Sequence, residues 1–222
     1  MSIKSNIVSL WAELAPRQCK LVAVSKTHPQ DLIMEAYEVG QRIFGENKAQ
    51  ELVSKWEVLP KDIEWHMIGH LQSNKVKYIV PFVKLIHSVD SQKLLIEINK
   101  QAAKVNRVIH CLLQVHIASE ETKFGMNHAE LRRIIGSLPE YPFVRVKGLM
   151  GMATLTDDTN QIRKEFAALR VLKDELKKNK ANTSYDMDEL SIGMSSDYQI
   201  ALEEGSTMVR IGSSVFGERK YS

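Results

Sequence analysis

The sequence predicts a single (β/α)8 barrel spanning residues 1–222, with an extra helix at the N-terminus. Three observations support this prediction. Short apolar runs, many of them β-branched, alternate with longer amphipathic stretches. There are eight such runs, which matches the strand count of a (β/α)8 barrel of this length. Glycine and small hydroxyl residues follow these runs, where a barrel builds its active site. A doubly wound open sheet stays the alternative, because periodicity does not exclude it.

The expected strands are short and come at regular intervals. In chain order they are Leu21–Val24, Arg42–Phe44, Glu64–Ile68, Leu85–Ser88, Val108–Val115, Val146–Met150, Glu189–Ile192 and Met208–Ile211. A helix over residues 3–14 precedes the first strand. Residues 91–103 and 161–176 have the clearest helical spacing, with apolar side chains three and four residues apart. Gly40 and Gly136 are expected at helix ends.

The composition is that of a globular protein with an ordinary core, since 44% of the residues are apolar and 26% are charged. The net charge of +3, with both signs interspersed, is not the electrostatic footprint of a nucleic-acid-binding protein. No signal-peptide core is present, and no run approaches the ~18 apolar residues of a membrane span. Cys19 and Cys111 lie outside any CxxC spacing and are expected as buried thiols. We therefore expect a cytoplasmic protein without nucleic-acid or membrane partners.

The first expected strand ends in an unusual way, because Ser25 and Lys26 follow its apolar residues at once. A buried ammonium group is costly unless it is paired or neutralised. Either Lys26 has left the core and points into water, or it stands at the mouth of a pocket and reacts as an amine.

The last two strands are followed by loops rich in glycine and serine, GMSS at residues 193–196 and GSS at residues 212–214. Barrels often bind a phosphate group with the loops after their seventh and eighth strands. Glycine lets the backbone approach an anion, and serine hydroxyls and backbone N–H groups donate to it. Two ordinary turns with good N-caps are the alternative.

A phosphate site and a reactive amine in one pocket suit pyridoxal 5'-phosphate (PLP), whose phosphate anchors it while its aldehyde condenses with a lysine. Arg210 lies in the eighth strand, and alternation turns it toward the interior, like Gly212. Arg210 either pairs with an acid on a neighbouring strand or donates to the ring nitrogen of the cofactor. Since guanidinium only donates, a ring nitrogen facing it stays unprotonated. Such a ring is a weak electron sink, which suits cofactor holding or proton transfer better than transamination.

Seven motifs, in order from residue 21 to residue 217, resemble a known family. They are LVAVSKTHP, FGENKAQE, WHMIGHLQSNK, HIASEETKFG, GLMGMAT, SIGMSSDY and VRIGSSVFG. Together they resemble the pyridoxal phosphate homeostasis proteins, which look like the isolated barrel domain of fold-type III enzymes such as alanine racemase. The resemblance covers nearly the whole chain.

The resemblance implies that Lys26 holds PLP as a Schiff base and that Arg210 faces the pyridine nitrogen. It also implies a phosphate cradle of Ser195, Gly212 and Ser213. Further pocket positions are expected for three residues: Asn47 and His66 by the resemblance, and Met194 by its place near a strand end.

The family's function implies a protein that buffers and delivers PLP and affects amino-acid and keto-acid balance. We expect PLP and amino acids as ligands, transient contacts with PLP-dependent client enzymes, and a monomer. A two-base racemase needs an acid/base group on each face of the substrate carbon. In alanine racemases the second is a tyrosine from an added domain, for which the chain ending at Ser222 leaves no room. We therefore expect little or no catalysis, with weak racemase-like activity at most.

Three other functions remain open at this stage. The first is a PLP-dependent amino-acid racemase or lyase of fold type III. The second is a barrel that binds a sugar phosphate, with Lys26 as an aldolase-type lysine. The third is a regulatory module that hands the cofactor to client enzymes through surface contacts, although nothing in the sequence marks such a surface. A metal site at His66 and His70 is not expected, because Gly69 and the expected strand oppose a shared helix face.

Overall fold

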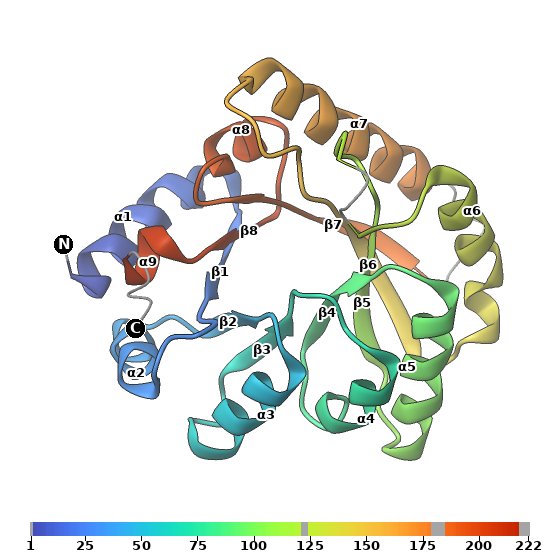
Figure 1. The fold of residues 1–222 in the computed structure, drawn as a ribbon, viewed down its shortest axis with the longest axis horizontal. Helices are drawn as coiled ribbons and strands as arrows, with labels where there is room; N and C mark the ends of the chain where they lie inside the picture. The colour runs from blue at the N-terminus through green and yellow to red at the C-terminus, as the bar shows by residue number, and fades with distance from the viewer. Residues whose placement is uncertain (1, 121–123, 179–184, 218–222) are drawn as a thin grey trace.

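The computed structural model describes residues 2–120, 124–178 and 185–217, and within them eight parallel strands close into a barrel (Figure 1). Neighbours in the sequence pair throughout, and β1 also pairs with β8, which excludes an open sheet. The predicted barrel with its added N-terminal helix is therefore confirmed. The strands are β1 Lys20–Val24, β2 Ile43–Glu46, β3 Glu64–Met67, β4 Leu85–Val89, β5 Ile109–Gln114, β6 Val144–Met150, β7 Tyr185–Met194 and β8 Met208–Ile211. The helices are α1 Ile3–Leu14, α2 Gln30–Val39, α3 Ala49–Val58, α4 Val76–Ile79, α5 Gln92–Lys104, α6 His128–Ser137, α7 Thr159–Lys178, α8 Tyr198–Glu203 and α9 Ser213–Phe216.

Every predicted apolar run overlaps one of these strands. The largest difference is in β7, which begins at Tyr185 rather than at Glu189. Asp186 interrupts the apolar pattern there, and it accepts hydrogen bonds from Arg145 and Lys147 of β6. These contacts between polar side chains therefore extend β7 at its N-terminal end, beyond the predicted apolar run.

The predicted helices over residues 3–14, 91–103 and 161–176 correspond to α1, α5 and α7. Gly40 ends α2 with a φ of 114°, a left-handed conformation that glycine adopts without strain. Gly136 lies inside the last turn of α6 and not after it, so this glycine does not end its helix.

Alternation along the strands divides the apolar core into two layers. In β1, Leu21 and Ala23 pack outward against the helices, whereas Val22 and Val24 fill the barrel interior. The interior layer is small. Its buried apolar members are Val22, Val24, Ile68, Leu85, Leu112, Met150 and Met208. Buried polar side chains, among them His87, Ser191 and Arg210, also point into the interior and can take part in chemistry.

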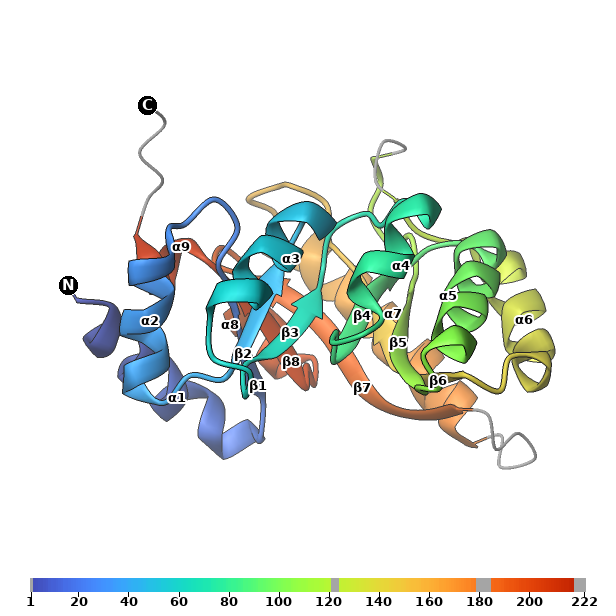
Figure 2. The ribbon, with the colours of Figure 1, turned by 90° about the horizontal axis from the view of Figure 1, so that it is seen from below.

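Figure 2 shows the barrel from the side, with the arrowheads of β2 and β3 pointing toward the top of the view. The loops that follow the strands therefore gather at this end, which is the end that carries the active sites of barrel enzymes. The helices form the outer layer around the strands, and α1 lies beside α2 and α9 (Figure 1).

Two expectations from composition concern the thiols and the membrane. Cys19 and Cys111 are both buried and free, as predicted. Of the helices in the described ranges, none combines the length and the apolar character that a bilayer span needs.

Candidate functional site

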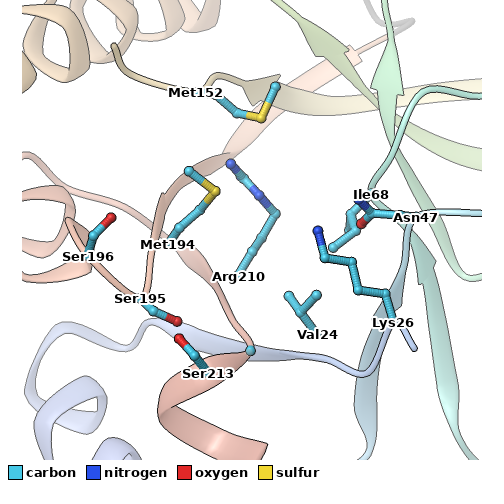
Figure 3. A pocket seen from close by; sticks show the side chains of 11 residues that line it. Val24, Lys26, Asn47, Ile68, Met152, Met194, Ser195, Ser196, Arg210 and Ser213 are labelled. Carbon is cyan, nitrogen blue, oxygen red and sulfur yellow. The ribbon is translucent and has the colours of Figure 1, made fainter. Parts of the chain in front are cut away.

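A cavity of about 590 Å³ opens at the carboxyl ends of the strands (Figure 3). Its volume lies within the range typical of small-molecule sites. The residues that line it come from the first, second, third, sixth, seventh and eighth strands or the loops after them. They are Val24, Lys26, Asn47, Ile68, Met152, Met194, Ser195, Ser196, Arg210, Gly212 and Ser213. Seven of the eight predicted site residues are therefore brought together at this cavity.

Lys26 reaches the cavity because it follows the alternation of β1, in which every second side chain points into the barrel. Val22 and Val24 point into the barrel, and two residues later the lysine lies over it. The turn that carries Lys26 is held from both sides. Lys55 donates to the carbonyl of Ser25 at 2.7 Å, and Glu51 accepts from the backbone N–H of Thr27 at 2.5 Å.

Behind this turn lies a buried ion pair between β2 and α3. Lys55 Nζ is 2.7 Å from Glu46 Oε1, which also accepts from the Ser25 hydroxyl at 2.6 Å. Glu46 is fully buried and Lys55 is only 5% exposed. Burial raises the pKa of Glu46, although Lys55 and Ser25 act in the opposite direction. The pair fixes the backbone next to Lys26 without entering the cavity.

Arg210 of β8 points into the cavity, where Figure 3 shows it between Met194 and Lys26, and it is 4% exposed. Its Nη1 donates to the carbonyl and the hydroxyl of Ser191, at 2.7 and 2.6 Å, and its Nη2 donates to the carbonyl of Gly151 at 3.0 Å. Burial lowers the pKa of Arg210 to about 10, so the guanidinium stays protonated at neutral pH. Among the described residues, none accepts a hydrogen bond from its Nε–H. That donor is available to a ligand in the cavity.

The serine-rich loops form a third side of the cavity. Figure 3 shows the hydroxyl groups of Ser195 and Ser213 pointing toward one another. Asp197 fixes the first loop, because its carboxylate accepts from the N–H of Met194 at 2.5 Å and its own N–H donates back to the Met194 carbonyl. Gly193 has a φ of 94°, and a Cβ there would lie 2.6 Å from the Ala201 side chain. This close turn requires glycine.

The remaining predicted pocket residues divide into two groups. Asn47 and Met194 line the cavity. His66 does not line it, because its side chain lies lower in the barrel, hydrogen-bonded to His87. Ser191, which holds Arg210, was not among the predicted site residues, although it is a small polar residue on the inward side of β7.

The cavity thus offers an amine, a guanidinium donor and a cluster of hydroxyl groups on separate sides. Such a set can bind a flat molecule that carries a carbonyl group, a ring acceptor and an anionic group. Burial of the guanidinium favours a neutral ring acceptor over a second cation, since like charges repel strongly at low dielectric.

Comparisons with known proteins agree with this description. Residues 1–220 match the family model described as alanine racemase, N-terminal domain. The pyridoxal phosphate homeostasis protein of Aquifex aeolicus is 44% identical over 203 residues, which cover 91% of this chain and 88% of the relative.

Solved structures show the same barrel. PipY of Synechococcus elongatus PCC7942 without PLP is 38% identical, with a TM-score of 0.91 over 97% of this chain and all of that chain. PipY with PLP bound has 37% identity, a TM-score of 0.88 and the same coverage. An alanine racemase from Streptomyces lavendulae is 19% identical, with a TM-score of 0.81 over 98% of this chain and 57% of that one, which shows the shared fold.

Proposed function

Because the chain belongs to the pyridoxal phosphate homeostasis proteins, within the alanine racemase N-terminal domain family, we propose that it binds PLP and helps to maintain the supply of this cofactor. In this proposal Lys26 holds PLP as a Schiff base. The observation that carries it is the meeting of three groups in one cavity: the Lys26 amine, the Arg210 Nε–H, which has no acceptor within the described part of the chain, and two serine hydroxyls.

The residues of the cavity fit each part of PLP. Lys26 supplies the amine that condenses with the aldehyde, and Arg210 supplies a donor to the ring nitrogen. Ser195 and Ser213 supply hydroxyl donors to the phosphate, and Gly212 lets the backbone come close. Asn47 and Met194 complete the lining as side walls.

The same residues favour holding the cofactor over transforming amino acids. When bound, PLP supplies a ring that accepts electrons from a substrate carbon. Arg210 can only donate, so it keeps the ring nitrogen unprotonated and the ring a weak acceptor. The proposal is therefore a carrier and regulator with little catalysis of its own.

The proposal extends to the setting in which the protein works. We place it in the cytoplasm as a monomer that exchanges PLP with client enzymes and amino acids. The free buried thiols of Cys19 and Cys111 support a reducing compartment.

The test is to add PLP to the purified protein, record the visible spectrum, reduce with borohydride and locate the modified peptide by mass spectrometry. We expect a yellow protein and a pyridoxyl group on Lys26. Lys26→Ala removes both signals. Lys48→Ala is the matched control, because this exposed lysine lies next to Asn47 and we expect it to keep both. A colourless wild-type protein that takes up no PLP contradicts the proposal.

A further inference from the structure

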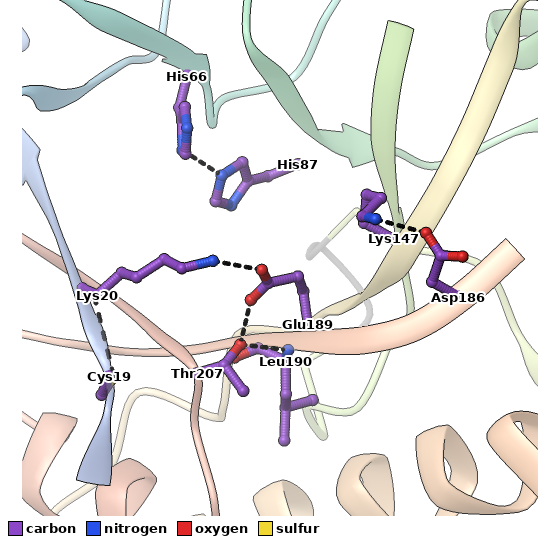
Figure 4. Close-up of polar contacts among 9 residues, drawn as sticks. All are labelled: Cys19, Lys20, His66, His87, Lys147, Asp186, Glu189, Leu190 and Thr207. Atoms are coloured by element: carbon purple, nitrogen blue, oxygen red, sulfur yellow. Dashed lines mark hydrogen bonds and ion pairs between the residues drawn. The ribbon is translucent and has the colours of Figure 1, made fainter. Parts of the chain in front are cut away.

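Two histidines are buried deep inside the barrel, below the proposed cofactor cavity. His66 of β3 is 3% exposed and His87 of β4 is fully buried. The Nδ1 of His66 lies 2.9 Å from the Nε2 of His87 (Figure 4). The Nδ1 of His87 lies 2.9 Å from the Ser191 hydroxyl, which also contacts Arg210. Four side chains from four strands therefore form one continuous hydrogen-bonded chain.

The direction of the hydrogen bonds in this chain follows from Arg210. A guanidinium has no acceptor, so Ser191 Oγ accepts from it. In the described part of the structure the Ser191 hydroxyl has one other side-chain partner, His87, so its proton goes to His87 Nδ1. His87 then carries its proton on Nε2 and donates to His66 Nδ1, and His66 carries its proton on Nε2.

Both imidazoles are neutral in this arrangement. Burial lowers the pKa of His66 to about 3 and that of His87 well below its ordinary value, and Arg210 contributes to the shift at His87. A charged His87 would need to donate to Ser191, which would leave two cations next to one hydroxyl.

The hydrogen-bonded chain of side chains ends in a second cavity, at the other end of the barrel. This lower cavity has a volume of about 320 Å³, and His66 lines it together with Lys20, Lys147 and Glu189 (Figure 4). Lys20 pairs with Glu189 and Lys147 pairs with Asp186. The hydrogen-bonded chain thus runs from the proposed cofactor cavity to the lower cavity.

We propose that Ser191 and His87 are positioning residues that hold the Arg210 guanidinium so that its Nε–H faces the ring nitrogen of the cofactor. This inference rests on the proposed function. The aligned neutral dipoles of the hydrogen-bonded chain stabilise the buried cation and leave its charge in place, whereas a carboxylate would neutralise it. They also remove the rotational freedom of the long arginine side chain before the cofactor arrives.

The test combines His87→Leu, Ser191→Ala and the double variant. PLP affinity is measured by spectrophotometric titration, together with the position of the visible absorption band of bound PLP. We expect each single variant to bind PLP about tenfold more weakly and with a shifted band, because Arg210 loses an ordered partner. We expect the double variant to be no weaker than the weaker single variant, since both act through one chain.

Two further variants separate positioning from general damage. His87→Asn keeps an acceptor near the place of Nδ1, and we expect binding within about threefold of the wild type. His110→Leu is the matched control, because His110 also lines the lower cavity but has no part in the chain. Wild-type affinity and an unshifted band in folded His87→Leu would overturn the inference, while PLP uptake by the wild type would still support the proposed function.

Nitrogen-15 NMR of the wild-type protein without cofactor tests the chain independently of any variant. We expect His66 and His87 both to be neutral with the proton on Nε2. A proton on Nδ1 of His87, or a charged ring, overturns the inference even where His87→Leu fails to fold. If the wild type takes up no PLP, both the proposed function and the positioning role fail. The NMR result alone still decides the direction of the hydrogen bonds between Ser191, His87 and His66.

Discussion

At His66 and His87, burial couples the stability of the fold to pH. An unfolded histidine has a pKa near 6.5, whereas burial lowers the pKa of His66 to about 3 in the folded protein. Between these values the unfolded chain binds more protons, so the free energy of unfolding falls as the pH falls. The slope approaches ~1.4 kcal/mol per pH unit for each buried histidine. The protein is therefore destabilised by mild acid before most carboxylates titrate.

His66→Gln removes one of these titrating groups. We expect the wild type to lose about 2 kcal/mol more stability than His66→Gln between pH 7 and pH 5, as measured by urea unfolding. His128→Gln is the control, because this histidine is exposed on α6 and its loss leaves the buried pair intact. Equal losses in the wild type and His66→Gln would contradict a buried neutral His66.

At the same scale, the sequence predicted the position of Arg210 but not its surroundings. Alternation along β8 placed Arg210 inward like Gly212, and in the structure both residues line the cavity. Its contacts with Ser191 and Gly151 depend on the register of β6, β7 and β8, where the pairing shifts. A period-based analysis contains no register between strands, so these contacts could not be predicted.

Between β2 and α3, the Glu46–Lys55 pair connects the barrel to its helical layer. Lys55→Met leaves the buried Glu46 without its cation, and we expect the free energy of unfolding to fall by about 3–5 kcal/mol at pH 7. Glu46→Leu combined with Lys55→Met removes both charges, and we expect it to recover most of this loss. Urea unfolding measures all variants.

The control for this prediction is Lys177→Met. Lys177 pairs with Asp188, and both side chains are more than half exposed, so we expect a change below about 1 kcal/mol. A Lys55→Met variant as stable as Lys177→Met would show that the Glu46 pair does not behave as a buried one.

Two glycines of neighbouring elements should respond to alanine in opposite ways. A Cβ on Gly148 of β6 would lie 1.8 Å from the backbone oxygen of Glu189, so we expect Gly148→Ala to yield little folded protein. A Cβ on Gly136 of α6 would meet nothing within 4 Å, and Gly136→Ala should stabilise the protein by ~0.5–1 kcal/mol. Expression yield tests the Gly148→Ala variant, and thermal melting tests the Gly136→Ala variant. A Gly148→Ala protein with the yield and stability of the wild type would contradict the close approach of β6 to β7 at Gly148.

Strands and helices could be predicted from the sequence wherever their apolar residues follow a regular spacing. All eight strands and three helices were predicted, because burial on one or both faces imposes a period. The first part of β7 was missed since Asp186 depends on partners in β6, which lie far away in the sequence. The short helices α4 and α9 have too few residues to show a period.

At the scale of the whole molecule, closure of the barrel makes the site. β1 and β8 lie at opposite ends of the chain, yet Val22 pairs with Arg210 across their shared edge. Lys26 and the serine loops therefore meet at one end of the barrel without any long-range signal in the sequence. The strand count and the residues after the strands sufficed to predict this meeting, because a closed parallel barrel allows no other place for them.

The composition of that site leads to a prediction about catalysis. Among the described residues that line the cavity, Lys26 is the only amine, and no carboxylate, histidine or tyrosine accompanies it. A single base removes and returns a proton on one face of a substrate carbon, whereas racemisation needs a group on each face. In heavy water with PLP and L-alanine, we expect any exchange of the α-proton to proceed with retention, seen by proton NMR. We expect D-alanine, measured by chiral chromatography, to form at least about a hundredfold more slowly than the exchange. Lys26→Ala should abolish the exchange, and D-alanine accumulating as fast as the exchange would mean that a second base reaches the cavity.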